Sequence, residues 1–258
     1  MTAEQPAAAG RPAHLFTGRD GVELAWHEIG TGRPVVLLHP LFGSGALQAD
    51  GRLARSLAAV GRRVILPDLR AHGASGHPHD PARYPPDVLA DDGLALIEQL
   101  GLDDYDLGGY SLGGKLALRL LARGARPARA FVIAQGVDAL DAESSRTGGY
   151  RELLDAVASG DVAPGSPAAG MAQWLAQAGT DPRAVSLLLG AMVPTARDTL
   201  RLVPVPVLIA VGDQDSRGAT AGELAGLLPD ARVVTVPGDH GTSVDAPELA
   251  AAVLDFLG

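Results

Sequence analysis

The stretch DYDLGGYSLGG at residues 104–114 decides the fold of this chain, and KLALRLL follows it at residues 115–121. The second run is apolar and rich in residues that favour a helix. Between the two lies the pattern Gly109-x-Ser111-x-Gly113, which predicts a strand that turns sharply into a helix with the serine at the turn. Such a turn exposes the hydroxyl beside a helix N-terminus, where free N–H groups favour negative charge.

Three fixed residues in a stretch of five occur by chance in many chains, so the pattern gains its weight from the strand and helix around it. The alternative interpretation is a glycine-rich connection in which Ser111 is incidental. The rest of the chain has to decide between a nucleophilic serine and a structural one.

The composition is that of a folded, acidic protein. The chain has 258 residues, 47% of them hydrophobic and 20% charged, which is enough to bury a sizeable core. A net charge of −9 argues against nucleic acid or an anionic membrane as a partner. The chain has no cysteine, which excludes disulfides, thiolate metal ligands and cysteine nucleophiles.

The start of the chain gives no sign of export. Residues 1–12 are polar and alanine-rich, lack the basic start and apolar run of a secretory signal, and are expected to form a flexible tail. No apolar run approaches the length needed to cross a bilayer. We therefore expect a cytoplasmic protein that binds neither membrane nor nucleic acid.

Strands and helices alternate along most of the chain. Besides the strand and helix that flank Ser111, strands are expected at residues 14–17, 22–29, 35–38, 64–66, 130–134, 205–211 and 232–236, and helices at 46–60, 87–100, 220–228 and 246–257. This order predicts an α/β fold with a mostly parallel central sheet and helices on both faces.

The alternation stops between residues 137 and 202. This segment contains four helical pieces separated by breakers such as APGSP at residues 163–167. We interpret it as a helical cap inserted into a single core domain, whose two parts are residues 1–136 and 203–258.

Polar residues that can carry chemistry follow several of the predicted strands. In open α/β sheets such residues collect at the carboxyl ends of the strands, and this rule selects Ser111, Asp215 and His240. A hydroxyl needs a base within hydrogen-bond reach, and the base needs a third group that fixes its tautomer. The order Ser, Asp, His is the order expected with this kind of turn. Asp213 and Asp138 remain as rival acids.

Other polar residues have structural interpretations. Asp239 adjoins His240 but is expected to point elsewhere, and His39 is expected to be a hydrogen-bonded loop residue. The loop residues Asp68, Arg70 and His72 are expected to tie their loop together. A further group has no defined ligand geometry, so we expect no metal site there; its members are His72, His77, His79 and Asp80.

The chain resembles the α/β-hydrolase superfamily, in the cap-bearing branch of esterases, lactonases and proline-iminopeptidase-like enzymes. The matching segments are LLH at 37–39, PDLRAHGAS at 67–75, GYSLGG at 109–114, GDQD at 212–215 and PGDH at 237–240. The resemblance extends from about Val22 to Gly258, except for the insertion. It implies an α/β-hydrolase fold, no cofactor, and Ser111 as nucleophile, Asp215 as acid and His240 as base.

Two positions depart from the family pattern. The family usually has His-Gly after the third strand, where this chain has His39-Pro40, and it more often has Gly at the position of Ala71. Proline lacks an N–H, but the donor that matters in the family lies one residue further on. The resemblance therefore implies an oxyanion hole made by the backbone N–H groups of Leu41 and Leu112.

The expected substrate is a small molecule with an apolar acyl or alcohol portion. Apolar side chains of the insertion and the strand-end loops are expected to contact it, namely Phe42, Tyr110, Met171 and Trp174. The expected activity is hydrolysis of a carboxylic ester, thioester or lactone through an acyl-enzyme. Two alternatives stay open: the same triad used for C–C bond hydrolysis, elimination or perhydrolysis, and a non-catalytic small-molecule binder.

Overall fold

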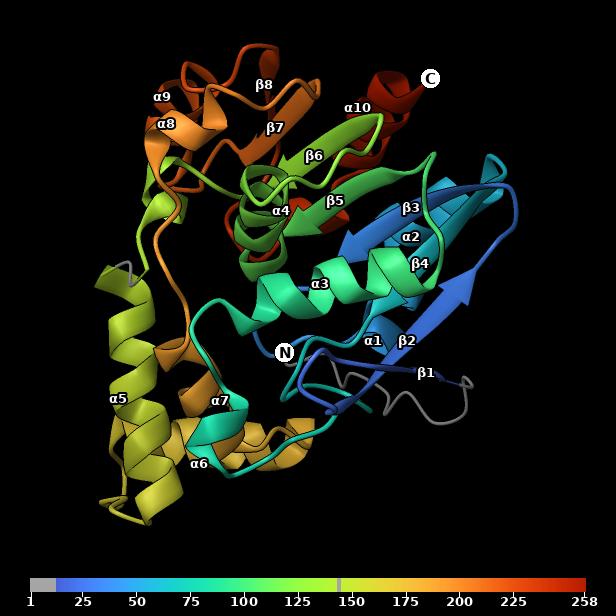
Figure 1. Cartoon of the computed structure of the whole chain (residues 1–258). Helices are drawn as coiled ribbons and strands as arrows, with labels where there is room; N and C mark the ends of the chain where they lie inside the picture. The colour runs from blue at the N-terminus through green and yellow to red at the C-terminus, as the bar shows by residue number, and fades with distance from the viewer. Residues whose placement is uncertain (1–12, 143–144) are drawn as a thin grey trace.

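A central sheet of eight strands organises the computed structural model, which describes residues 13–142 and 145–258 (Figure 1). The strands are β1 (His14–Thr17), β2 (Glu23–Ile29), β3 (Arg33–Leu38), β4 (Arg62–Pro67), β5 (Asp106–Tyr110), β6 (Arg129–Ile133), β7 (Val207–Gly212) and β8 (Ala231–Val236). The flexible tail expected at residues 1–12 lies outside the described residues.

The sheet is mostly parallel, as predicted. Its strand order is β1-β2-β4-β3-β5-β6-β7-β8. The pairs β1–β2 and β2–β4 are antiparallel, and every later pair is parallel. The carboxyl ends of six strands, from β4 to β8, therefore reach the same edge of the sheet.

Helices cover both faces, and the side chains of each strand alternate between the two layers. The helices are α1 (Gly45–Asp50), α2 (Arg52–Ala59), α3 (Val88–Gln99), α4 (Leu112–Ala122), α9 (Gly218–Ala225) and α10 (Pro247–Leu257), with the short turn η1 (Pro81–Arg83) before α3 and η3 (Ser243–Asp245) before α10. Within β3, Val36 and Leu38 pack into the layer of α3, α4 and α9, whereas Val35 and Leu37 pack into the layer of α1, α2 and α10. Apolar residues on both faces explain why this strand is a continuous hydrophobic run.

One predicted helix is wrong in its extent. The helix expected at residues 46–60 is divided by Gly51, which is extended with φ −67° and ψ 153° and separates α1 from α2. Glycine in a helix interior is less favourable than alanine by roughly 1 kcal/mol. Ending the helix at Gly51 therefore sacrifices little helix stability.

The segment between β6 and β7 contains only helices among its described residues. They are η2 (Val137–Leu140), α5 (Ser145–Ser159), α6 (Pro167–Ala178), α7 (Pro182–Gly190) and α8 (Arg197–Leu200). Figure 1 shows α5, α6 and α7 grouped beyond the sheet, away from the helices that cover its faces. The division of the chain into a core and a cap stays a prediction.

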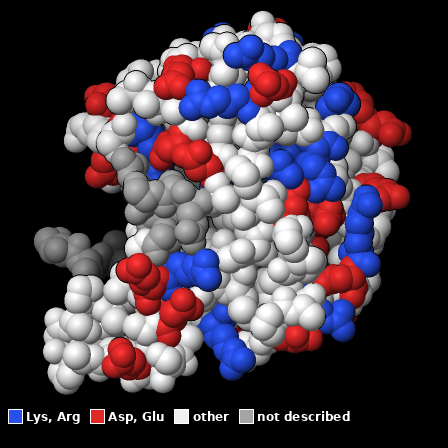
Figure 2. Space-filling view, turned by 60° about the vertical axis from the view of Figure 1, so that its left-hand side comes forward, with Lys and Arg blue, Asp and Glu red and all other residues white. Residues whose placement is uncertain are grey.

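The surface carries both signs of charge. On the face shown in Figure 2, acidic and basic side chains are interspersed and leave wide uncharged areas between them. Among the described residues, no helix has both the length and the apolar character that crossing a bilayer requires.

Candidate active site

The turn between β5 and α4 places Ser111 at the edge of the sheet. β5 ends at Tyr110, α4 begins at Leu112, and Ser111 between them has φ 53° and ψ −115°. Residues other than glycine rarely adopt a positive φ, so the rest of the fold must hold Ser111 in this conformation. The turn also needs glycines: a Cβ on Gly109 would lie 2.2 Å from the Gly113 carbonyl, and one on Gly113 would lie 2.1 Å from the Leu38 oxygen.

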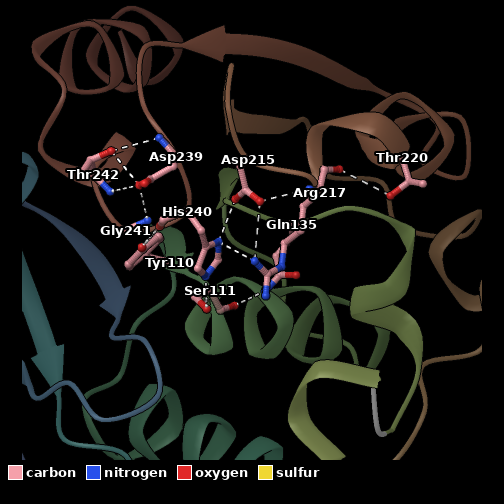
Figure 3. A network of polar contacts seen from close by, with 10 residues as sticks. All are labelled: Tyr110, Ser111, Gln135, Asp215, Arg217, Thr220, Asp239, His240, Gly241 and Thr242. Atoms are coloured by element: carbon pink, nitrogen blue, oxygen red, sulfur yellow. Dashed lines mark hydrogen bonds and ion pairs between the residues drawn. The ribbon is translucent and has the colours of Figure 1, made fainter. Parts of the chain in front are cut away.

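Two hydrogen bonds link the three residues that the sequence selects (Figure 3). Ser111 Oγ lies 3.0 Å from His240 Nε2, and His240 Nδ1 lies 2.7 Å from Asp215 Oδ2. With Nδ1–H donating to the carboxylate, Nε2 is left as an acceptor for the serine proton. The fold therefore brings together a hydroxyl, an imidazole and a carboxylate that lie far apart along the chain.

Asp215 is held as an anion. Its carboxylate is 1% exposed. Burial works to raise the pKa of Asp215, but hydrogen bonds from the Arg217 backbone N–H and from His240 outweigh it, so the pKa lies below the ordinary value. An ionised carboxylate at this position stabilises the Nδ1–H tautomer and any imidazolium that forms.

The other acids considered for this role have surroundings of their own. Asp213 accepts a hydrogen bond of 2.9 Å from the Gly238 N–H and so joins the loops after β7 and β8. Asp239 accepts from the backbone of Gly241 and from Thr242, in a turn that directs its carboxylate away from the imidazole (Figure 3). Asp138 is on η2, where it lines the cavity described below.

The two residues expected to supply the oxyanion donors lie beside Ser111. Leu41 and Leu112 both line the cavity at the serine. Within the described part of the chain, no hydrogen bond beyond those internal to helices and strands uses either backbone N–H. Pro40 does not break the loop, because the turn is closed by the Gly43 N–H donating to the Pro40 carbonyl at 2.9 Å.

Two buried histidines hold the loop of residues 39–43 from behind. His39 accepts from the Leu69 N–H at 2.9 Å, and His72 accepts from the Phe42 N–H at 3.2 Å, each through Nε2. Their Nδ1 atoms face the Pro40 and Arg70 carbonyls. Burial lowers the pKa of His39 to about 3 and that of His72 to about 4, so both rings stay neutral acceptors at ordinary pH.

The loop after β4 is tied together by its own charged residues, as the sequence analysis expects. Asp68 accepts from the Gly45 N–H at 2.6 Å and the Ala74 N–H at 2.8 Å. Arg70 is buried and pairs with Asp20 and Asp92. These contacts hold Ala71 at φ 65°, the left-handed conformation for which the family more often uses glycine.

A cavity of about 830 Å³ opens over Ser111. Phe42, Tyr110 and Trp174 line it, whereas Met171 lines an adjoining hollow of about 480 Å³ that shares Leu41, Phe42, Tyr150 and Trp174 with the cavity. Phe42 makes edge-to-face contacts with Trp174 at 4.9 Å and with Tyr150 at 5.8 Å between ring centroids. Aromatic residues from the core and from α5 and α6 therefore meet at the boundary between the two spaces.

Tyr110 has a second contact that the sequence analysis does not anticipate. Its hydroxyl donates to the backbone carbonyl of His240 (Figure 3). The same residue thus lines the cavity and anchors the loop that carries the base.

Four polar residues around Ser111 have positions that the sequence patterns do not predict. Arg217 Nη1 lies 2.6 Å from His240 Nδ1 and 3.6 Å from Asp215 Oδ1. Gln135 donates to the Ser111 carbonyl, and Lys115 and Asp138 line the cavity. A signal for Lys115 exists, because it follows Ser111 by four positions and so shares a helix face with it.

The histidines for which no metal site is expected lie in the loop before α3. There His79 Nε2 lies 2.6 Å from Asp181 Oδ2, at the N-terminus of α7. Among residues 13–142 and 145–258, no three or more side chains of metal-ligating type converge.

Comparison with known proteins identifies the family. The family model for the alpha/beta hydrolase fold matches residues 33–153. A non-heme haloperoxidase from Rhodococcus erythropolis is 31% identical over an alignment of 279 positions, gaps included, that covers 94% of this chain and 98% of that protein. The chain belongs to the α/β-hydrolase superfamily.

Two further proteins resemble this chain to different extents. A 2-hydroxymuconate semialdehyde hydrolase from Pseudomonas is 33% identical over 148 residues, so the match spans about half of each protein, 52% of this chain and 51% of the relative. An esterase from Exiguobacterium antarcticum superimposes with a TM-score of 0.76 over 95% of this chain and 99% of that one. At 20% identity this last likeness shows the fold alone.

Proposed function

We propose that this α/β hydrolase is a serine hydrolase that cleaves a small carboxylic ester, thioester or lactone through an acyl-enzyme. The observation that carries the proposal is the pair of hydrogen bonds from Ser111 to His240 and from His240 to Asp215, at 3.0 and 2.7 Å. A neutral imidazole within reach of a hydroxyl, with its tautomer fixed by a buried carboxylate, is the arrangement that activates serine as a nucleophile.

Acylation uses these groups in turn. Ser111 Oγ attacks the carbonyl carbon while His240 Nε2 takes the hydroxyl proton, and Asp215 stabilises the imidazolium. The carbonyl oxygen becomes an oxyanion that accepts from the Leu41 and Leu112 N–H groups. As the C–O or C–S bond breaks, His240 gives its proton to the leaving group. Water, activated by the same imidazole, then hydrolyses the acyl-enzyme and restores Ser111.

The proposed substrate is a small molecule with an apolar portion. The cavity has the volume of a small-molecule site, and the hollow beside it is lined by Phe42, Met171 and Trp174. An acyl or alcohol chain in that hollow buries apolar surface against aromatic rings, which contributes about 25 cal/mol per Å².

Ser111→Ala tests the mechanism. We expect the variant to lose at least about 10⁴-fold in kcat for an aryl ester, because the nucleophile is gone, and to keep the fold as judged by circular dichroism. A fluorophosphonate probe should label the parent protein and fail to label the variant. The matched control is Ser159→Ala, which removes an exposed hydroxyl near the end of α5.

Two outcomes contradict the proposal. If Ser111→Ala keeps most of the ester hydrolysis, the mechanism is wrong. If the parent protein hydrolyses no ester and the probe does not label it, the remaining interpretation is a small-molecule binder on this fold.

Perhydrolysis is a second candidate, and the similarity to the haloperoxidase along nearly the whole chain favours it. In this reaction hydrogen peroxide attacks the acyl-enzyme in place of water, and the products are a peracid and free Ser111. A peracid assay in acetate and peroxide tests it, with Ser111→Ala as the negative control. Equal peracid formation with and without the enzyme excludes this candidate.

C–C bond hydrolysis and elimination remain weaker alternatives. The relative that bears on C–C cleavage matches only about half of this chain. An assay with a dihydroxy-enone beside the aryl ester separates these activities: faster turnover of the enone would replace ester hydrolysis as the proposed function.

A further inference from the structure

Besides Arg217, which faces His240, the cavity over Ser111 is lined by two charged side chains that ester hydrolysis does not use. Lys115 lies on α4, one helical turn after Ser111, and Asp138 lies on η2 just after β6. Both line the cavity. Neither touches the hydrogen bonds that join Ser111, His240 and Asp215, so their position needs another explanation.

Asp138 is an acceptor without a donor. Its Oδ1 is buried and has no hydrogen-bond partner, although the side chain as a whole is only half-buried. A buried carboxylate oxygen that lacks a partner has lost its hydration without a compensating hydrogen bond. Because the negative charge is shared by both oxygens, a donor that approaches the carboxylate from the cavity offsets part of this cost.

Lys115 has more N–H donors than the protein carbonyls that accept from it. Its side chain is 8% exposed, and Nζ donates to the carbonyl oxygens of Asp141 and Ala142, the latter at 3.2 Å. An ammonium has three N–H donors, so these two carbonyls leave one N–H for another partner. Within the described residues, Lys115 and Asp138 form no direct ion pair with each other.

The combination selects the chemistry of the ligand group. An anion bound here would be repelled by Asp138, and a cation would be repelled by Lys115. A neutral group that both donates and accepts satisfies the two side chains together, and a hydroxyl is the smallest such group.

The hydroxyl belongs on the acyl side of the scissile bond. His240 protonates the leaving group in the proposed mechanism, so the leaving group lies beside the His240 loop. In Figure 3 the chain that follows Gln135, which leads to η2, leaves the site on the side away from that loop. The Lys115 N–H donates to the Ser111 carbonyl at 3.0 Å, so the Lys115 side chain leaves α4 close to Ser111.

We propose that Lys115 and Asp138 form a hydroxyl-binding subsite, and that the preferred substrates are esters whose acyl chain has a hydroxyl a few bonds from the scissile carbonyl. Asp138 accepts from the substrate hydroxyl and Lys115 donates to it. This inference rests on the proposed ester hydrolysis, because it names the substrate class of the same site.

The experiment compares kcat/KM for ethyl 3-hydroxyhexanoate, ethyl 3-oxohexanoate and ethyl hexanoate. We expect the parent protein to prefer the hydroxy ester to ethyl hexanoate by about 10-fold or more, since a site built to bind a hydroxyl discriminates against analogues without it. The oxo ester can accept but not donate, so it should lose most of this advantage. Asp138→Leu should abolish the preference, and Asp138→Asn, which keeps one acceptor oxygen, should retain part of it.

Asp141→Asn is the matched control. It removes an exposed carboxylate near Lys115 that does not line the cavity, and the preference should survive. Equal kcat/KM for the three esters in the parent protein would overturn the inference, as would a preference that persists in Asp138→Leu.

Calorimetry separates this inference from the proposed function. Ser111→Ala should bind ethyl 3-hydroxyhexanoate more tightly than ethyl hexanoate, whether or not the parent protein turns either ester over. Tighter binding without turnover would leave the subsite in place and refute the serine hydrolase. Turnover of ethyl hexanoate with equal binding of both esters would support the hydrolase and refute the subsite.

Discussion

At the scale of single residues, Arg217 changes the chemistry expected of the base. Its Nη1 lies 2.6 Å from His240 Nδ1, and that nitrogen also lies 2.7 Å from Asp215. Nδ1 cannot donate to the carboxylate and accept from the guanidinium at the same time. In the tautomer that leaves Nε2 free for the serine proton, a fixed positive charge therefore faces the ring and opposes its protonation.

Arg217→Met should move the acidic limb of the pH profile of kcat/KM to higher pH. The sign follows from the charge: without the neighbouring cation, imidazolium forms more readily, and the base is lost at a higher pH. Arg217→Lys keeps the charge and should stay close to the parent profile. Superimposable profiles for Arg217→Met and the parent would show that the guanidinium has no influence on the base.

Residues differ in how far the sequence reveals them. Ser111, Asp215 and His240 each follow the end of a strand, and parallel strands bring such ends to one edge, so a local pattern is enough to select them. Arg217 could not be found this way, because its significance depends on a contact with His240 across 23 positions. The hydroxyl of Tyr110 reaches the His240 carbonyl across 130 positions, which no local pattern encodes.

At the scale of elements, the crossing of β5, α4 and β3 depends on glycine. A Cβ on Gly109 would lie 2.2 Å from the Gly113 carbonyl, and the atoms it meets are backbone atoms that cannot rotate away. The same glycines are therefore needed both to pack α4 against β5 and to place Ser111 at the turn.

Gly109→Ala should lower the free energy of unfolding by about 3 kcal/mol or more, because the added methyl overlaps fixed backbone. Gly222→Ala is the comparison, since a Cβ there meets nothing within 4 Å and the residue lies inside α9. That substitution should stabilise the protein by roughly 0.5–1 kcal/mol. Urea unfolding measures both, and similar values for the two variants would contradict the packing argument.

A contact between elements also forms the mouth of the cavity. Trp174 on α6 packs edge-to-face on Phe42 from the core and is 45% exposed. Trp174→Ala should reduce kcat/KM for hexanoyl and longer esters by about 10-fold through a higher KM, and should affect acetyl esters little. A profile across acyl chain lengths measures this. A uniform loss for short and long esters would show that the ring has a structural role only.

At the scale of the whole molecule, buried ionisable groups set the response to acid. Burial lowers the pKa of His39 to about 3 and of His72 to about 4. Unfolding exposes both rings, which then bind protons below about pH 6.5. The free energy of unfolding must therefore fall as the pH drops below that value, until the folded protein also binds the protons. Burial raises the pKa of Asp92 to about 6, which offsets part of this loss between about pH 6 and pH 4.

His72→Gln isolates one of these contributions. The variant should be somewhat less stable at pH 7, because a flexible amide replaces the buried ring as acceptor for the Phe42 N–H, and its stability should fall less steeply with acid. We expect the slope between pH 6 and pH 4.5 to decrease by about 1.4 kcal/mol per pH unit. Urea titrations at several pH values measure it, with His77→Gln on the same loop as the control. If the stability of His72→Gln and of the parent changed with pH in the same way, the lowered pKa of His72 would be contradicted.

The fold class could be predicted because strand and helix periods alternate clearly, and the mostly parallel sheet and the α/β-hydrolase fold are confirmed. The break at Gly51 could not, because the apolar residues on either side continue one helical face. The cavity was also beyond prediction: its walls combine α4, the strand-end loops and the helices between β6 and β7, whose placement depends on packing across the whole chain.

The helices between β6 and β7 begin and end at neighbouring strands, with Ile133 opposite Ala210 in the sheet. The chain leaves β6 at its carboxyl end and enters β7 at its amino end, where Val207 pairs with Ala130, so a segment of another length that spans this crossover could be joined there without opening a single rung of the ladder. Tyr150 and Trp174, which shape the mouth, come from this segment, whereas Ser111 and His240 do not. One recombination event at these two strands could therefore exchange substrate preference and leave the reaction chemistry intact.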